Sequence, residues 1–425
     1  MTDSADSGKP RLPSKAMPSS RGKTSKSRPK LRDGVMKRGN TWSYVIRVTD
    51  PETGVSKPKW VGGFVTEDAA KEARDEARVK ARRGEYIDRN AITVAEYLDE
   101  WLDAHAVEIK PKTLADYRHL IDRHVKPNIG GLRLQAVRPG QITKLYRDLV
   151  TTGGRHGTGL SPRTVAYVHA VLRKAFGDAL LVDQVIPSNP VERAKRPRMR
   201  SAEPGEVWTP AMLRAFLKVA ETHRLSAFFH LAAYTGARRG ELLHLRWRDV
   251  DLDGASMQIK GSASFIAGER IEGTTKSGRS RTVSLDAGTV DVLKAHRKRQ
   301  LADKLKLGKS WKGADKEADG YVFATGWGDP VHPDTVSSLM TSLIKLHNTP
   351  TDGTSPAEPL PHARLHDLRH IHATTLLLAG VPVHVVAARL GHADPSITLR
   401  VYAHVVNQQL VEAAEIFAKR VEDAA

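Results

Sequence analysis

Near the end of the chain, one short stretch places charged side chains where an apolar helix should begin. It reads "LHDLRHIHATTLLLAG" from Leu365, so that His366 and Arg369 stand three residues apart and share a helix face. A guanidinium fork matches the oxygens of a phosphodiester, and it neutralises the charge that grows on phosphorus during a substitution. The pair is therefore of a type that suits contact with a phosphate, whereas the following "ATTLLLA" suits a protein core.

Four other positions offer the remaining parts of such a site. Arg238 follows a Thr-Gly break in "AAYTGARRGELLHLRW", and Lys276 stands at a glycine turn between strands in "TTKSGRSRTV". His392 and Tyr402 both lie in "LGHADPSITLRVYAH". A tyrosine hydroxyl can attack phosphorus once a base takes its proton, and a lysine can protonate the leaving 5′ oxygen. The product is a phosphotyrosyl bond, which keeps the energy of the broken linkage for rejoining. This chemistry needs neither a metal nor another cofactor.

Some of these residues have simpler interpretations. Arg239 suits a solvated helix arginine or an ion-pair partner of Glu241 better than a catalytic role. Lys276 is the least certain member of the set, since Arg279 and Arg281 are close enough in sequence to be the working cation. Both alternatives stay open at this point.

A metal site is a weaker alternative. His362, His366 and His370 recur every four residues, a spacing that metal ligands use, but the chain has no HExxH motif. It also has no cysteine, which excludes thiolate zinc sites, disulfides and a cysteine nucleophile.

Composition points to a polyanionic partner. The chain has 425 residues, a formal net charge of +19 and a pI near 10.0, values typical of proteins that bind nucleic acid. It contains no apolar run long enough to cross a membrane, and its N-terminus lacks the apolar core of a signal peptide. We therefore expect a protein of the cytoplasm whose partner is a polyanion, most often nucleic acid.

Changes in composition divide the chain into five parts. The predicted fold is mainly α with small β-sheets (α+β). The expected parts are a disordered basic tail (1–33), a small domain of a three-stranded sheet plus one helix (34–90), a helical domain (91–185), an extended basic linker (186–207) and a mixed, mainly helical domain (208–425). The tail fits two roles equally well: a basic arm that contacts DNA phosphates, and a segment that only keeps the protein soluble. In the first domain, Trp42, Tyr44 and Trp60 are more often core residues than a base-contacting surface.

Taken together, the quoted motifs and their order resemble the tyrosine recombinases of the phage-integrase type. The resemblance covers residues 92–425, and residues 34–85 are similar to the arm-site-binding domain of many integrases. It implies that Arg238 and Arg369 clamp the scissile phosphate, with His366 and His392 as its other partners. It also implies Lys276 as the general acid and Tyr402 as the nucleophile.

The resemblance also implies partners. They are double-stranded DNA at core-type and arm-type sites, three further copies of the chain in a tetramer, and a host bending protein or directionality factor. The expected function is site-specific recombination that integrates a phage or another integrative element. The alternatives are a type IB topoisomerase and a DNA-binding regulator with an inactive catalytic domain. After Tyr402, an apolar stripe in "AHVVNQQLVEAAEIFAKRVEDAA" suits docking onto a neighbouring protomer or closure of its own domain.

Overall fold

The described parts of the chain form two compact units. The structure, a computed structural model, describes residues 33–49, 54–82, 86–87, 90–197, 208–276, 278–315, 319–349, 358–392, 394, 396 and 417–423. The first unit holds the described residues up to Asp99 together with His124–Pro197. The second holds Glu100–Arg123 and the described residues from Trp208 onward.

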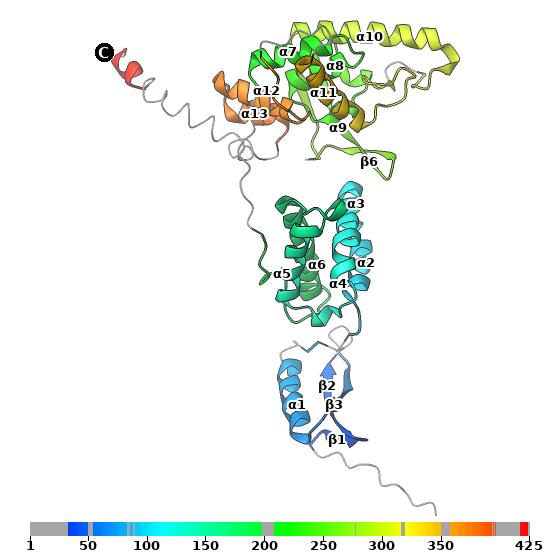
Figure 1. Cartoon of the computed structure of the whole chain (residues 1–425), viewed down its shortest axis with the longest axis vertical. Helices are drawn as coiled ribbons and strands as arrows, with labels where there is room; N and C mark the ends of the chain where they lie inside the picture. The colour runs from blue at the N-terminus through cyan, green and yellow to red at the C-terminus, as the bar shows by residue number, and fades with distance from the viewer. Residues whose placement is uncertain are drawn as a thin grey trace, which may run out of the picture. The chain divides into compact units, whose positions relative to one another are not determined.

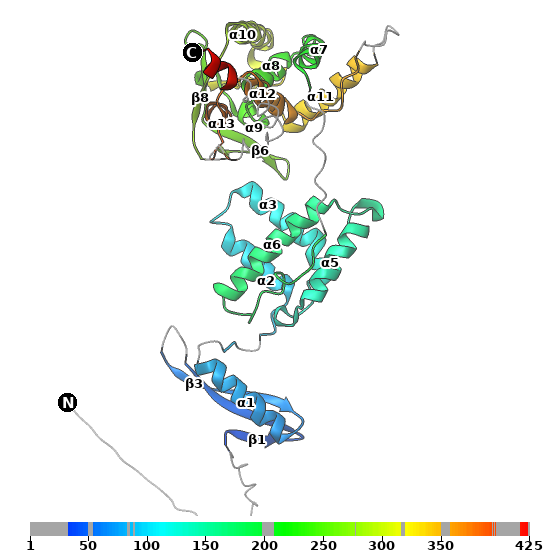
Figure 2. The same ribbon diagram turned by 90° about the vertical axis from the view of Figure 1, so that its left-hand side faces the viewer.

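A three-stranded antiparallel sheet and one helix come first, as the sequence predicts. The elements are β1 (Val35–Arg38), β2 (Thr41–Thr49), β3 (Ser56–Phe64) and α1 (Glu67–Arg82), with strand order β1-β2-β3. The helix lies along one face of the sheet (Figure 1, Figure 2). Thr66 caps α1, because its hydroxyl oxygen accepts a hydrogen bond from the Ala69 N–H at 3.2 Å.

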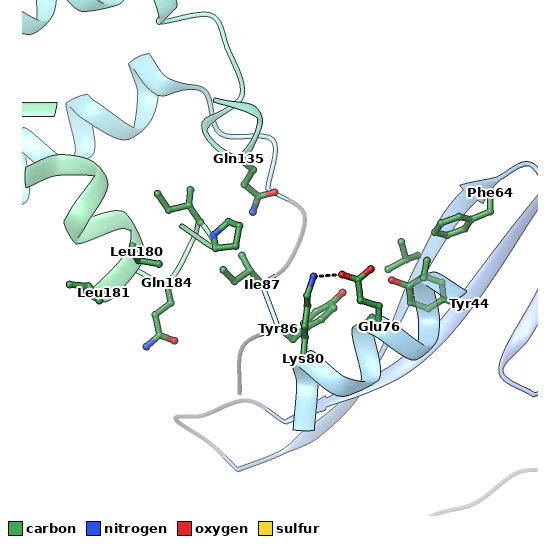
Figure 3. A pocket seen from close by; sticks show the side chains of 15 residues that line it. Tyr44, Phe64, Glu76, Lys80, Tyr86, Ile87, Gln135, Leu180, Leu181 and Gln184 are labelled. Carbon is green, nitrogen blue, oxygen red and sulfur yellow. Dashed lines mark hydrogen bonds and ion pairs between the residues drawn. The ribbon is translucent and has the colours of Figure 1, made fainter. Parts of the chain in front are cut away.

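The aromatic residues of this sheet lie in different environments. Tyr44 is buried in the small core, whereas Trp60 is 42% exposed and carries the Arg38 guanidinium 4.3 Å from its ring centroid. Tyr44 also lines a hollow with the Glu76–Lys80 ion pair of α1 (Figure 3). The core interpretation is therefore right for Tyr44 and wrong for Trp60.

Helices follow where the sequence predicts them. They are α2 (Val94–His105), α3 (Pro111–Leu120), the π-helical turn η1 (Ile121–Val125), α4 (Lys126–Ile129), α5 (Pro139–Thr152) and α6 (Pro162–Leu181), with the short 3-10 turns η2 (Leu134–Ala136) and η3 (Arg155–Gly157). Proline opens α3, α5 and α6, where its missing N–H costs no helical hydrogen bond. Pro127 lies in the first turn of α4 and does not end a helix, and Gly130 caps that element.

The segment expected to be an extended linker is packed along its first part. Ile186, Asn189 and Val191 are buried. The Asn189 side chain donates to the Arg173 carbonyl at 3.1 Å, and the Lys195 N–H donates to the Thr143 hydroxyl at 3.0 Å. Although this segment is basic, the apolar residues between its prolines are buried, and they keep its first part packed on the unit. Residues 198–207 lie outside the described part.

The last part of the chain is a mainly helical unit with small sheets. Its helices are α7 (Pro210–Ala220), α8 (Ser226–Thr235), α9 (Arg239–His244), α10 (Ala287–Leu307), α11 (Pro333–Asn348), α12 (Asp367–Leu378) and α13 (Val383–Leu390), with 3-10 turns η4 (Trp247–Asp249) and η5 (Gly308–Ser310). Strands β4 (Val250–Asp251), β5 (Ser256–Ile259) and β8 (Arg281–Ser284) form one antiparallel sheet, and β6 (Gly261–Ile266) pairs with β7 (Glu269–Thr274).

Helix α8 is the centre of this unit. It packs against α7, α10 and α12 (Figure 1). Most of its residues are buried. Phe228 and Phe229 join Phe216 and Phe323 in an aromatic cluster with ring centroids 5.2–5.6 Å apart. Because its apolar residues surround it, α8 gives a rigid base to the loop that follows it.

Two helices near the end of the chain hold the predicted motifs. The apolar helix expected in this stretch is α12, which begins at Asp367, so that His366 is the residue directly before it. Helix α13 ends at Gly391, whose φ of +69° is left-handed, a conformation that glycine adopts readily. In the short helix at 417–422, Phe417 and Val421 are exposed, while the rest of the predicted apolar stripe lies outside the described residues. Within the described part, no helix combines the length and apolarity that a membrane span needs.

Candidate active site

Four of the six predicted site residues line one pocket. Arg238, Lys276, His366 and Arg369 surround a cavity of about 600 Å³, although they come from segments far apart in sequence. They belong to the α8–α9 loop, the β7–β8 turn, the residue before α12, and the first turn of α12. His392 follows α13, and the charges of Arg369 and Arg238 reach its ring. Cations and imidazoles therefore meet at one cavity, whose wall also includes apolar residues such as Phe228 and Leu365.

Arg369 is more deeply buried than the sequence predicts. Its side chain is held by two backbone carbonyls, with Nη1 donating to Gly236 at 2.7 Å and Nη2 to Leu390 at 2.8 Å. Gly236 has a φ of +63°, and a Cβ there would lie 2.6 Å from Leu390. Glycine thus lets the Thr-Gly turn approach the end of α13, and Arg369 joins the two at the pocket wall.

Arg238 shares a buried carboxylate with a second arginine. Its Nη1 donates to Glu241 Oε1 at 2.8 Å, and its backbone N–H donates to Oε2 at 2.9 Å. Arg281 donates to both oxygens of the same carboxylate, at 3.1 and 2.7 Å. Burial alone would raise the pKa of Glu241, but the hydrogen bonds and charges of Arg281 and Arg238 outweigh it and lower that pKa. Glu241 is therefore an anion that fixes Arg238.

Lys276 lies exposed in a turn whose neighbours are held tightly. Buried Thr275 donates its hydroxyl to the Arg279 carbonyl at 2.7 Å and accepts the Gly278 N–H on its own carbonyl at 3.0 Å. Arg281, an alternative cation in the sequence, is committed to Glu241, and Arg279 is exposed. Lys276 is thus the cation of this turn that lines the pocket.

Both predicted histidines favour the neutral form. Partial burial, with the positive charges of Arg369 and Arg238, lowers the pKa of His366 and of His392 to about 4. His370 also contributes to the shift of His366, and their ring centroids are 5.0 Å apart. At pH 7 each ring can therefore donate one hydrogen bond without adding charge. No group of three or more potential ligands suited to a metal ion occurs among the described residues.

Three family models match successive parts of the chain. The Phage integrase family matches residues 206–409, the phage integrase N-terminal SAM-like domain matches 93–150, and the Arm DNA-binding domain matches 35–81. The chain belongs to the tyrosine recombinase family. The resemblance seen in the motifs is confirmed, and so is the assignment as a recombinase enzyme.

Relatives of this recombinase come from bacteria and a phage. A "Tyrosine recombinase XerC-like" protein of Caldanaerobacter subterraneus is 28% identical over 82% of this chain and 89% of its own. An integrase of Streptomyces ambofaciens is 29% identical over 73% of this chain and 76% of its own. The integrase of Mycobacterium phage L5 is 25% identical over 73% and 75%.

Solved structures share the fold. The Tn1549 transposon integrase in complex with a circular intermediate DNA has a TM-score of 0.59 at 18% identity, over 73% of this chain and 94% of that one. A lambda integrase tetramer bound to a Holliday junction has a TM-score of 0.53 at 18% identity, over 88% and 96%. The predicted fold class is thus confirmed.

Sequence reasoning missed the carboxylate of Glu241, which holds Arg238 of the candidate site. One of the two simpler interpretations of Arg239, an ion pair with Glu241, is wrong. Arg239 donates to the Ser337 hydroxyl at 2.8 Å, and Glu241 pairs with Arg238 and Arg281. A carboxylate between apolar residues in "RGELLHL" was the available signal. The predicted nucleophile, Tyr402, lies outside the described residues.

Proposed function

We propose that this recombinase cuts and rejoins DNA at specific sites through a covalent 3′-phosphotyrosyl intermediate. The proposal names Tyr402 as nucleophile, Arg238 and Arg369 as the phosphate clamp, and Lys276 as general acid. His366 and His392 would hydrogen-bond the phosphate. The convergence of two arginines and a lysine on one cavity carries this proposal, because such a set suits the charge of a phosphodiester and of its transition state.

The reaction balances with these residues alone. The Tyr402 oxygen attacks phosphorus, the bond from phosphorus to the 5′ oxygen breaks, and Lys276 gives a proton to that oxygen. The tyrosine proton passes to a neighbouring base, for which a neutral imidazole is suited. Rejoining runs in reverse, with a 5′ hydroxyl attacking the phosphotyrosyl bond. No external energy source is needed, since one phosphoester replaces another.

We propose the division of labour that the sequence predicts. Residues 34–90 would bind arm-type DNA, 91–185 would bind core-type DNA, and 208–425 would catalyse. The match of an Arm DNA-binding model to residues 35–81 supports the first role, as does the exposed Arg38–Trp60 stack on the sheet. Integration at chosen sites needs this second DNA-binding module, whereas a type IB topoisomerase does not.

The proposed working form is a tetramer on two DNA duplexes. A lambda integrase structure with the same fold is a tetramer on a Holliday junction, and this supports the assembly here. The similarity to the integrase of Mycobacterium phage L5 supports a role in integrating a mobile element, such as a phage genome. A host bending protein or a directionality factor would select the direction.

A nicked suicide substrate tests the function. It carries the cognate core site, and the cleaved end diffuses away so that the covalent complex accumulates. We expect an adduct with the cognate site and none with a scrambled site of equal length. Adduct on both DNAs would indicate a topoisomerase, and binding without adduct would indicate an inactive regulator.

A further inference from the structure

Arg281 is an arginine that the proposed chemistry does not use, although it binds the same carboxylate, Glu241, as Arg238. It opens strand β8, and its side chain is only 10% exposed. Three of its nitrogens are committed. Nη1 and Nη2 donate to the two oxygens of Glu241 at 3.1 and 2.7 Å, and Nε donates to the Arg389 carbonyl at 3.0 Å. The guanidinium therefore bridges a side chain on α9 and the backbone at the end of α13.

At its α9 end, Arg281 determines how strongly the Glu241 carboxylate attracts the Arg238 guanidinium. The carboxylate lies between the two guanidiniums, so the cluster of two cations and one anion carries a net charge of +1. Without Arg281, the same buried anion would face Arg238 alone and the cluster would be neutral. Arg238 would then be drawn to Glu241, and its charge would be less available to a phosphate.

At its other end, Arg281 holds the turn that carries His392. The last carbonyls of α13 form the negative end of a helix dipole, and Arg281 and Arg369 donate to two of them, at Arg389 and Leu390. A Cβ on Gly391 would lie 2.6 Å from Arg281 Nη1, so glycine lets the guanidinium approach the chain directly before His392. One guanidinium thus fixes both the clamp and the histidine turn.

We propose that Arg281 is a positioning residue that couples the Arg238 clamp to the His392 turn through Glu241 and the end of α13. The proposal rests on the proposed function. Arg281 does not act as the general acid, because a guanidinium stays protonated and three of its nitrogens already donate to protein groups. Lysine is a poor substitute, since it has one charged nitrogen and cannot reach a carboxylate and a carbonyl as a fork does.

The test compares single-turnover cleavage of the suicide substrate by full-length variants, with DNA affinity and thermal unfolding measured beside it. Arg281→Met should cleave about 100-fold more slowly, the usual scale for a misplaced catalytic group, while DNA affinity changes less than about threefold. The double variant Glu241→Gln/Arg281→Met should recover about tenfold of that loss. In this variant no carboxylate at position 241 draws the Arg238 guanidinium away from the phosphate. Arg299→Met, at an exposed position of α10, is the control for loss of one positive charge and should match the wild type.

A second substrate separates positioning from mere folding. A methylphosphonate at the scissile position lacks one negative charge and depends less on the clamp. Arg281→Met should therefore lose less activity on it than on the phosphodiester, whereas a structural defect would lower both rates equally. If Arg281→Met does not fold, Arg281→Lys serves, with an expected loss of about tenfold on the phosphodiester.

Three results would overturn the inference. They are wild-type cleavage by the folded Arg281 variant, no recovery in the double variant, and an equal loss on both substrates. Failure of the proposed function looks different, because then the wild type itself forms no covalent adduct.

Discussion

Replacing Glu241 by glutamine should destabilise the catalytic unit measurably. The Glu241 side chain is 1% exposed and holds Arg281, which is 10% exposed, and Arg238, which is 23% exposed. Glutamine keeps the shape but leaves a buried guanidinium without its anion. Breaking a buried pair in this way lowers the free energy of unfolding by about 3–5 kcal/mol. Because Arg238 is partly exposed in the pocket, we expect a loss near the lower end, at about 3 kcal/mol.

The assay is thermal unfolding of the full-length protein followed through the catalytic unit. At about 2–4 °C per kcal/mol for a domain of this size, Glu241→Gln should lower Tm by about 6–12 °C at pH 7. The matched control is Asp319→Asn, which removes an exposed carboxylate from its pair with Arg248 and should cost less than about 1 kcal/mol.

The pH dependence of this difference has a definite sign. The pKa of Glu241 in the folded state lies below its ordinary value of 4.5. Its contribution is therefore complete above pH 4.5 and is lost as the pH falls below that value. The Tm gap between wild type and Glu241→Gln should stay constant from pH 8 to about pH 5.5 and narrow below pH 4.5. If Glu241→Gln lowers Tm at pH 7 no more than Asp319→Asn does, the reasoning is refuted.

Three further predictions concern the histidines and the two ends of the chain. The depressed pKa values of His366 and His392 mean that only the unfolded state gains their protons as the pH falls below 6.5. The double variant His366→Asn/His392→Asn should thus lose less Tm between pH 7 and pH 5 than the wild type, and identical losses would contradict this. A protein without residues 1–90 should still cleave core sites but integrate poorly, as seen in a two-plasmid assay; normal integration would argue against the arm role. Deletion after Val406 should leave single-site binding intact and abolish the synaptic complex on native gels, and a normal yield of that complex would show that the tail only closes its own domain.

Local patterns predicted the elements that carry the site. The Thr-Gly break marked the end of α8, because capping depends on a few neighbouring residues. The approach of Lys276 to Arg238 and Arg369 followed only from the resemblance, since no local rule brings residues so distant in sequence to one cavity.

The error at Glu241 has a physical origin. Residues two apart on a helix do not share a face, whereas residues three apart do. Glu241 accordingly pairs with Arg238 and not with Arg239. Its second partner, Arg281, is brought by the β5–β8 pairing from 40 positions further along the chain, which the sequence pattern does not reveal.

The packed start of the expected linker shows a similar limit. Prolines and basic residues in 186–197 indicated an extended chain, but Ile186 and Val191 are buried. Composition averages over a window, whereas burial depends on which few apolar side chains meet a neighbouring surface.

The central claim is that Tyr402 forms the covalent bond to DNA, and mapping the adduct tests it most directly. Wild-type protein would be trapped on the suicide substrate, digested with a protease and nuclease, and sequenced by mass spectrometry. We predict one phosphorylated nucleotide remnant, attached to Tyr402, and no adduct from Tyr402→Phe although that variant binds the same DNA normally. A remnant on any other residue, or an adduct formed by Tyr402→Phe, would contradict the account.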